Sequence, residues 1–531
     1  MTLVDHLPVL TVLLPALTAV LLLLIGDGAG QGGHGQVQLL WARRIALASA
    51  LLGAVLAFRL VEQAAGGNIT VYRLGEWPAP FGIVLVIDRL SALMLGLSAA
   101  VALPVLWYAS GGWDAQGRHF HALFQFQLMG LNGAFATGDL FNLFVFFEVL
   151  LIASYVLMMH GLGRQRLRVG VHYVVLNLAA SALFLVGVAL LYALTGTLNM
   201  ADLALRVPMV TGPEAGVLQA AALLLLVVFG FKAALIPLAM WLPATYAAAS
   251  APVAALFAIM TKVGVYSILR VHGVIFGADA GASAFTVQPL LLPLALLTSL
   301  IGVAGALAAQ TLPRLIAWLT VTSVGTILAA IGLFDAAAWS AALYYLLNST
   351  LVIAGLFLLA ELVASQRGPM ADRLEPCSPV TQPALLGLML LLAAASTAGL
   401  PPLPGFIGKL MLLQAATQHE WAVAVWVVVL LVGFLTLVGL ARAGSVLFWS
   451  VRHDVQGSAS GASPPKLLSA TVALLGLSVL LSVWAAPLQR YTQATALQLL
   501  DRASYARAVL GEQGGEAAQT TRPYRIGNPR P

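Results

Sequence analysis

The sequence predicts an all-α polytopic membrane protein with about 14 transmembrane helices. Hydrophobic residues make up 60% of the 531 residues and charged residues 9%, with a mean hydropathy of +0.95. A soluble domain has roughly half apolar and a quarter charged residues, so this composition excludes a water-soluble fold. Apolar runs of about 20 residues, long enough to cross a bilayer, also recur along nearly the whole chain.

The predicted spans follow one another at short intervals. They are centred near residues 16, 50, 97, 128, 150, 182, 226, 260, 297, 323, 350, 393, 433 and 477. The first, Pro8 to Ile25, has no basic residue ahead of it, which indicates a retained anchor and not a cleaved signal peptide. After the last span, residues 489–510 alternate apolar and basic side chains, and either a surface-lying or a solvated helix fits them. Residues 511–531 form a polar tail that we expect to be disordered.

The net charge of +6 does not indicate a nucleic-acid partner, because the basic residues are scattered singly. They are better explained as topology signals. Basic residues are more frequent in the loops after odd-numbered spans, with a cluster at Arg164, Arg166 and Arg168. The positive-inside rule then places both termini on the non-cytoplasmic side.

Several classes of function lack support in the sequence. The single cysteine, Cys377, excludes a disulfide framework and a cysteine metal site. The chain has no phosphate-binding loop of the Walker type, no dinucleotide-binding glycine motif and no clustered His or Cys ligands. We therefore predict no catalytic residue, no cofactor and no metal, and do not expect an enzyme.

The lysines are the most informative residues. Only four of the 26 basic residues are lysine, and three of these, Lys232, Lys262 and Lys409, interrupt apolar segments. A lysine inside a span costs about 2.5–3.5 kcal/mol on insertion scales, so three of them require a reason. Arginine stays protonated at any biological pH, whereas a lysine removed from water can release and rebind a proton. Two structural alternatives are a lysine that reaches the interface and a fixed ion pair.

Glu148 is the sole acidic residue within the fifth predicted span. A carboxylate at that depth is tolerated when a lysine neutralises it, and Lys232 is the partner we expect. Separation of the two charges would change the proton affinity of Glu148, which makes the pair a workable switch. A permanent stabilising pair is the alternative.

Prolines interrupt two spans close to these lysines. Pro237 follows Lys232 by five residues, and Pro401, Pro402 and Pro404 precede Lys409 by five to eight. Proline removes a backbone hydrogen bond and breaks a helix. Broken helices in two separate parts of the chain suggest two structural repeats with a polar path at the breaks.

At these residues the sequence resembles the antiporter-like subunits shared by Mrp or Pha-type Na⁺/H⁺ antiporters and respiratory complex I. The resemblance extends from about Gly82 to Trp449. Its motif residues are Glu148, Phe231-Lys232, Pro237, Trp241-Leu242-Pro243, Thr261-Lys262-Val263-Gly264, Gly399-Leu400-Pro401-Pro402, Gly405-Phe406 and Lys409. The family implies 14 spans and two inverted five-helix repeats, with half-channels joined by the Glu and Lys residues at mid-membrane.

The resemblance also implies a division of the chain. Three helices in residues 1–110 would precede a first repeat in residues 119–272 and a second in residues 286–450. The last span would lie in residues 466–488. The D-type subunits of the antiporters are the most similar members, because the M-type subunit of complex I has glutamate where this chain has Lys409.

The chain departs from the family pattern in the tenth and eleventh spans. Pro313, Ser323, Ser349 and Ile353 stand at positions where lysine, histidine or glutamine is usual. The link between Lys262 and Lys409 is therefore expected to use water and other polar side chains, namely Thr320, Thr322, Ser323 and Asn348.

The sequence thus predicts a subunit of a bacterial inner-membrane antiporter that exchanges protons for Na⁺ or K⁺. Its partners would be the other subunits, the two ions and membrane lipid, with no nucleic acid. One rival is a proton-pumping subunit of a redox-driven complex, such as complex I or a membrane hydrogenase. A second rival is a scaffold whose buried charges only hold subunits together.

Overall fold

The computed structural model describes residues 3–26, 33–377, 379–450 and 461–511, and it is helical almost throughout. The helices are α1 (Leu7–Ile25), α2 (Gly33–Ala65), α3 (Arg89–Ala109), α4 (Phe120–Ala136), α5 (Leu140–Met159), α6 (Arg164–Thr195), α7 (Met200–Arg206), α8 (Pro213–Ala233), α9 (Trp241–Ala248), α10 (Ala251–Ile268), α11 (Gln288–Leu307), α12 (Leu312–Ile331), α13 (Ala336–Ser365), α14 (Pro383–Ala398), α15 (Pro404–Ala416), α16 (Ala422–Phe448), α17 (Pro465–Val483), α18 (Ala485–Leu500) and α19 (Arg502–Leu510). The all-α membrane fold is confirmed.

Among the described residues, 12 helical segments are long and apolar enough to cross a membrane. All the predicted span centres fall within helices. Two of those helices, α4 with 17 residues and α14 with 16, are too short to count among the 12. The total of fourteen spans therefore stays a prediction.

Burial is distributed as a bilayer requires. The apolar 18-residue stretch that could span the membrane is 100% buried in α10 and 94% buried in both α12 and α13. The outer helices instead direct large apolar side chains outward: Leu24 of α1 is 81% exposed and Val423 of α16 is 77% exposed. Because such side chains would be unfavourable in water, this outer surface is suited to lipid.

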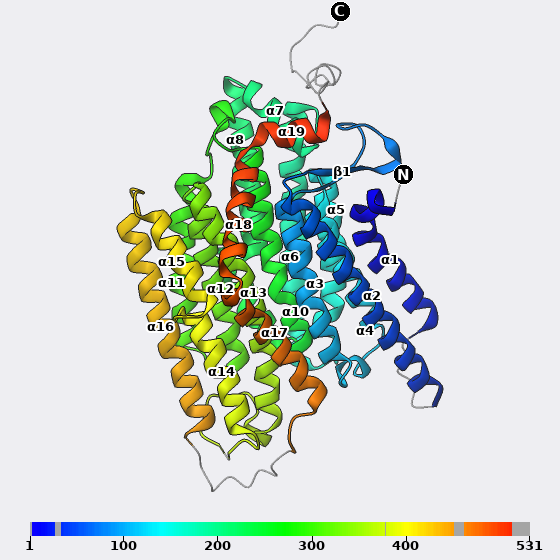
Figure 1. Ribbon diagram of the computed structural model, residues 1–531, viewed down its shortest axis with the longest axis vertical. Helices are drawn as coiled ribbons and strands as arrows, with labels where there is room; N and C mark the ends of the chain where they lie inside the picture. The colour runs from blue at the N-terminus through cyan, green and yellow to red at the C-terminus, as the bar shows by residue number, and fades with distance from the viewer. Residues whose placement is uncertain (1–2, 27–32, 378, 451–460, 512–531) are drawn as a thin grey trace, which may run out of the picture.

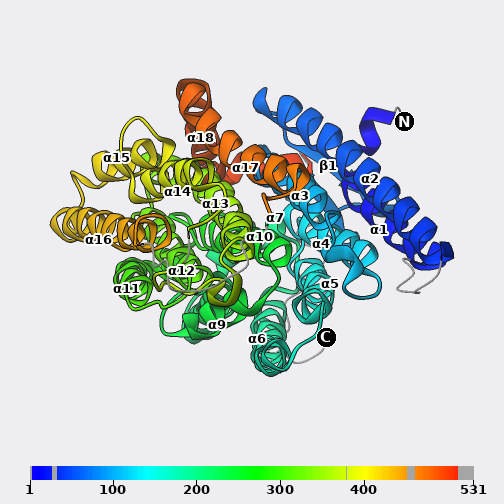
Figure 2. The ribbon, with the colours of Figure 1, turned by 90° about the horizontal axis from the view of Figure 1, so that it is seen from below.

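Helices α1 to α16 pass broadly from one side of the bundle to the other, whereas α17 and α18 return to the middle, against α3 and α13 (Figure 1). Seen along the bundle, α1 to α4 lie at one edge, α14 to α16 at the other, and α10 and α13 in between (Figure 2). A kinked or broken helix occurs in each half: α8 is followed by α9 after a break, and α14 by α15. The central helices α10 and α13 therefore lie between the two breaks.

One small sheet departs from the predicted all-helical pattern. Strand β1 (Thr70–Arg73) pairs antiparallel with β2 (Val84–Ile87), with Thr70 opposite Ile87. The run Val-Leu-Val-Ile is rich in β-branched residues, which favour a strand, and all four residues are buried. Four residues are too few to cross a bilayer, so this hairpin belongs to a loop.

The C-terminal helices are fixed to the bundle by hydrogen bonds. Residues 489–510, expected to form a surface or solvated helix, belong to α18 and α19. The Tyr491 hydroxyl donates to the carbonyl of Arg89 over 3.1 Å, and the Gln498 amide donates to the carbonyl of Gly67 over 2.9 Å. Thr492 lies 2.8 Å from Ser340 of α13. Of the predicted tail, residues 511–531, only Gly511 belongs to the described residues.

Candidate functional site: buried lysines at two helix breaks

The first break follows directly from local sequence. Helix α8 ends where Ala234 adopts a left-handed φ of 66°, and Pro237 has no N–H with which to continue the helix. The Trp241 indole donates to the carbonyl of Phe231 over 3.1 Å and so ties α9 to the end of α8. Lys232 lies in the last turn of α8, where the helix dipole favours a positive charge.

Lys232 is held by a side chain of α6. Its Nζ donates to Asn177 Oδ1 over 2.9 Å and lies 5.9 Å from the centre of the Phe147 ring. Glu148, the residue after Phe147 on α5, accepts a hydrogen bond from the Ser181 hydroxyl. Asn177 and Ser181 are one helical turn apart on α6, so this helix receives both charged groups on one face.

The expected partnership of Glu148 and Lys232 consists of two nearby charges that attract each other, without a direct ion pair. Ion pairs with N···O distances up to 4.0 Å occur elsewhere in the described residues, but none joins these two groups. Each group uses its own hydrogen-bond partner on α6, and Asn177 stands beside Lys232 where the carboxylate was expected. The two charges are therefore neighbours separated by polar side chains of α6.

Lys262 lies at the middle of α10 without a fixed partner. Every residue from Pro252 to Ile268 is buried, and Lys262 Nζ has no hydrogen-bond partner among the described residues. Its neighbours Met260 and Val263 line a small cavity that also touches Lys232 and Asn177. The cavity has about 20 Å³ open to the centres of water molecules, which is room for one water. A water there could connect α10 to the first break.

Close packing holds α10 beside the first break. A Cβ on Gly264 would lie 2.5 Å from the backbone nitrogen of Ala233 and 2.6 Å from the carbonyl oxygen of Phe229. Only glycine permits that approach, so the motif Thr261-Lys262-Val263-Gly264 positions Lys262 next to the end of α8.

The second break holds Lys409 in a different way. Helix α14 ends at Gly399, with φ 89°, and α15 begins at Pro404. Lys409 Nζ donates to the carbonyl of Thr397 over 3.1 Å and to that of Ala398 over 2.8 Å. These carbonyls belong to the last turn of α14 and have no partner within the helix. Lys409 therefore caps α14 from the other side of the break, and its Nζ lies 5.9 Å from the Tyr345 ring centre.

The four residues expected to connect Lys262 with Lys409 divide into two groups. Thr320, Thr322 and Ser323 donate back to carbonyls of their own helix, α12, over 2.8–3.0 Å. Asn348 of α13 instead accepts from the hydroxyl of Ser396 over 3.0 Å and from that of Ser478 over 2.8 Å. Asn348 thus joins α13 to α14 and α17 next to the second break.

Sequence reasoning missed the partners of these groups. Asn177 and Ser181 bind Lys232 and Glu148, and Ser396 and Ser478 bind Asn348. Asn177 and Ser181 carry a usable signal, because two polar residues four apart in an apolar span share a face. Glu361, near the end of α13, was also missed although it is acidic and within a span.

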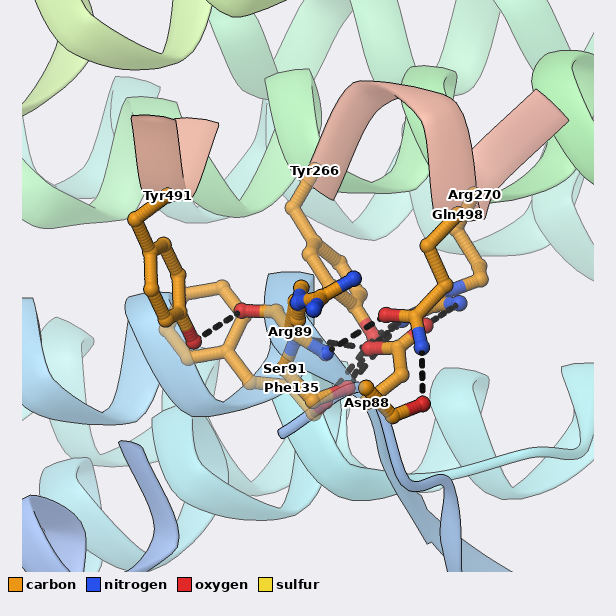
Figure 3. Close-up of polar contacts among 9 residues, drawn as sticks. Asp88, Arg89, Ser91, Phe135, Tyr266, Arg270, Tyr491 and Gln498 are labelled. Atoms are coloured by element: carbon orange, nitrogen blue, oxygen red, sulfur yellow. Dashed lines mark hydrogen bonds and ion pairs between the residues drawn. The ribbon is translucent and has the colours of Figure 1, made fainter. Parts of the chain in front are cut away.

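The far end of α10 carries a third polar cluster (Figure 3). Arg270 forms a two-fold ion pair with Asp88, with distances of 2.6 and 2.8 Å, and its Nη2 also donates to Ser91 over 3.1 Å. Burial alone would raise the pKa of Asp88, but the charge and hydrogen bonds of Arg270 hold that pKa below its usual range. All three guanidinium nitrogens of Arg270 have partners, and the cluster fixes the end of α10 to the start of α3.

Comparison with known proteins gives the family. The sequence profile described as NADH:quinone oxidoreductase/Mrp antiporter, TM, matches residues 137–436, which include both breaks and all three buried lysines. The chain belongs to this family. As a member of the NADH:quinone oxidoreductase/Mrp antiporter family it has curated relatives over nearly its full length.

Two such relatives carry informative names. The D subunit of a probable K⁺/H⁺ antiporter from Rhizobium meliloti (strain 1021) is 42% identical over 95% of this chain and 98% of its own length. The D subunit of the Na⁺/H⁺ antiporter from Alkalihalophilus pseudofirmus is 38% identical over 96% of this chain and 100% of its own. Both are named as transporter subunits.

Solved structures agree with the fold. A chain of the Mrp complex from Dietzia sp. DQ12-45-1b superposes with a TM-score of 0.84 at 28% identity, covering 96% of this chain and 100% of that one. A chain of respiratory complex I from Thermus thermophilus gives 0.75 at 24% identity, covering 93% and 99%. At that lower identity the likeness concerns the fold alone.

Proposed function

We propose that this chain is the D-type subunit of a multisubunit Mrp/Pha-type antiporter, which exchanges protons for Na⁺ or K⁺ across a bacterial inner membrane. Relatives named as D subunits of antiporters align with nearly the whole chain at 38% and 42% identity. The observation that carries the mechanism is the position of the lysines. Three of the four lysines are buried, two at helix breaks and one on the wholly buried α10 between them.

The proton path in this proposal runs past Glu148 and Lys232, then Lys262, then Lys409. Asn177 holds Lys232 by one hydrogen bond, so Lys232 can leave it and approach Glu148 without disrupting the backbone. That movement changes the electrostatic potential at Lys262, whose Nζ has no hydrogen bond among the described residues to oppose a change of protonation. Water and the polar groups of α12 and α13, including Asn348, complete the link to Lys409.

The two inverted repeats are part of the same proposal. Residues 119–272 hold the first break with Lys232, and residues 286–450 hold the second with Lys409. Both termini are assigned to the non-cytoplasmic side. The start of α1 and helix α19 lie toward the same end of the bundle, which supports a common side (Figure 1).

A redox-driven proton pump is the second candidate, because the fold is shared with complex I. A chain of an archaeal membrane-bound sulfane sulfur reductase also superposes with a TM-score of 0.83 at 25% identity. The relatives with the higher identities are named as antiporter subunits, which favours antiport.

The test is salt-dependent dissipation of a pH gradient in everted vesicles that contain the whole antiporter complex. We expect added Na⁺ or K⁺ to dissipate the gradient with the native chain and at least a tenfold slower response with Lys262→Ala, because a methyl group cannot carry a proton. Lys466→Ala is the matched control. Lys466, the remaining lysine, lies at the start of α17 and donates to the carbonyl of Ser110, away from both breaks.

The outcomes separate the candidates. Normal exchange by an assembled Lys262→Ala complex contradicts the proton path. A native complex with no salt response favours the redox-driven pump. Loss of assembly in Lys262→Ala, without a selective loss of transport, favours the scaffold.

A further inference from the structure

A large vestibule lies at the end of the bundle where α10 begins. The centres of water molecules can occupy about 750 Å³ of the vestibule. Its walls come from the start of α6, the junction of α9 and α10, the start of α12 and the end of α13. Its lining includes Arg164, Arg166, Ser250, Arg314, Glu361 and Asp372. Arg270 and α19 lie at the other end of α10, so the vestibule and the Arg270 cluster occupy opposite ends.

Glu361 stands on the vestibule wall with half of its carboxylate unsatisfied. One oxygen accepts a hydrogen bond from the Trp113 indole, whereas the other, Oε2, is shielded and has no partner among the described residues. The backbone N–H of Ala251, the first residue of α10, donates to the carboxylate, and the positive charge of Arg166 attracts it. The Ser250 hydroxyl, on the preceding residue, is also buried without a hydrogen bond in the described part of the chain. Two residues with an unpaired oxygen atom, Glu361 and Ser250, therefore line the vestibule near the start of α10.

A purely structural role explains only part of this arrangement. The hydrogen bond from Trp113 ties the short turn Trp113–Ala115 to α13, and a neutral glutamine could accept it equally well. A buried polar atom without a partner is unfavourable and uncommon, so the second oxygen needs a reason. Exchange of protons with vestibule water supplies one.

We propose that the vestibule is an aqueous mouth of the proton path and that Glu361 exchanges protons between its water and the interior at the start of α10. This inference rests on the proposed antiport function and adds a protonatable group that the path through Glu148 and the lysines does not contain. From Ala251, Lys262 lies eleven residues along α10, or about 16 Å at 1.5 Å per residue. That distance requires a short chain of water or hydroxyl groups, of which Ser250 is the first.

The number of oxygen atoms at Glu361 favours a proton over a metal cation as the ligand. Arg164 and Arg166 from α6 and Arg314 from α12 line the vestibule, against Asp372 from the loop after α13. Tyr108 of α3 also faces Glu361. One free carboxylate oxygen is too few for a metal cation, which needs several oxygen ligands. A proton needs one acceptor and a water to carry it.

The experiment combines transport with accessibility. In everted vesicles we expect Glu361→Gln to slow cation-dependent dissipation of the pH gradient at least tenfold while the complex still assembles, because glutamine keeps the bond to Trp113. Glu361→Asp should recover a measurable part of the rate, since it restores a carboxylate. Asp372→Asn, on the same vestibule, is the matched control and should exchange at the native rate.

Accessibility tests the vestibule independently of transport. In a Cys377→Ser background, Ala364→Cys, on the vestibule wall, should react with a membrane-impermeant thiol reagent from one side of the membrane only. Absence of labelling from both sides overturns the proposal, as does an assembled Glu361→Gln complex that exchanges at the native rate. If the native complex shows no antiport at all, the proposed function fails and this inference fails with it. If the native complex shows antiport and Glu361→Gln exchanges at the same rate, the role of Glu361 is contradicted while the proposed antiport function stands.

Discussion

At the first break Lys232 donates to the side chain of Asn177, whereas at the second break Lys409 donates to the backbone carbonyls of Thr397 and Ala398. The first lysine has a carboxylate nearby, Glu148 on α5. Both lysines also lie 5.9 Å from an aromatic ring centre, but the negative partners of Lys409 are two carbonyl dipoles at a helix end.

This difference separates a movable charge from a structural one. Lys232 can exchange Asn177 for another partner and leave only a side-chain amide behind. Lys409 cannot leave without exposing two carbonyls that α14 does not satisfy. Both lysines suit a proton path, but only Lys232 can change its hydrogen-bond partner without leaving backbone groups unpaired.

The largest expected effect concerns packing at the two breaks. A Cβ on Gly405 would overlap the carbonyl oxygen of Ser396, and one on Gly264 would lie 2.5 Å from the nitrogen of Ala233. We expect Gly405→Ala to prevent assembly and Gly264→Ala to destabilise the protein by about 3 kcal/mol or more, because both helices would have to separate. Thermal unfolding of the purified complex is the measurement.

The control for these substitutions is Gly216→Ala in α8, where nothing lies within 4 Å of the added carbon. It should leave the melting temperature unchanged or slightly higher. Native stability of Gly405→Ala would mean that α14 and α15 are not in contact as described.

The next effect distinguishes the two lysines directly. We expect Lys232→Ala and Lys409→Ala both to abolish exchange. Lys409→Ala should lower stability more than Lys232→Ala, because it leaves two backbone carbonyls unpaired where Lys232→Ala leaves one side-chain amide oxygen, at roughly 1–3 kcal/mol for each. Lys409→Arg should restore most of that stability, since a guanidinium can donate to both carbonyls, and should still fail to exchange because arginine keeps its proton. Equal losses of stability in the two alanine variants would contradict the distinction between a movable and a structural lysine.

The smallest effect compares two helix caps, one in each half. Asp139 accepts from the backbone of Asn142 at the start of α5, and Asp335 accepts from Ala337 and Ala338 at the start of α13. Burial raises the pKa of Asp139 from 3.8 to about 6. The folded protein therefore binds the Asp139 proton more tightly than the unfolded chain does. This proton binding stabilises the fold below about pH 4, and the stabilisation is lost as the pH rises through about 6.

Asp139→Asn should remove that pH dependence and raise stability at about pH 7.5 by roughly 1–3 kcal/mol, because asparagine caps a helix without a buried charge. The exposed Asp335 provides the control, and Asp335→Asn should change stability by less than about 0.5 kcal/mol at either pH. Melting temperatures at about pH 4.5 and about pH 7.5 are the measurement. If the stability of Asp139→Asn still changed with pH in the same way, the pH dependence would belong to another group.

Local signals in the sequence located the helices, the breaks and the three lysines. An apolar run, a proline and a charge within a span each act through the chain around them, so no tertiary information is needed to find them.

Partners across helices were not predictable in this way. The hydrogen-bond partners of Glu148 and Lys232 were not predicted, because the rotation of α6 places Asn177 and Ser181 beside them, and helix rotation depends on packing along the whole helix. Glu361 was missed because its partner, Trp113, is 248 residues away in sequence. The hairpin of β1 and β2 was missed because four apolar residues next to a predicted span are easily counted with it.

The position of Lys262 on α10 has an electrical consequence. The buried segment Ala251–Gly273 has 23 residues, and Lys262 is at its midpoint. A proton that binds Lys262 from either side therefore crosses about half of the membrane potential. A full elementary charge gains about 2.3 kcal/mol per 100 mV, so this step gains or loses roughly 1.2 kcal/mol per 100 mV. Occupancy of Lys262 should consequently follow the voltage across the membrane as well as the pH on its two sides.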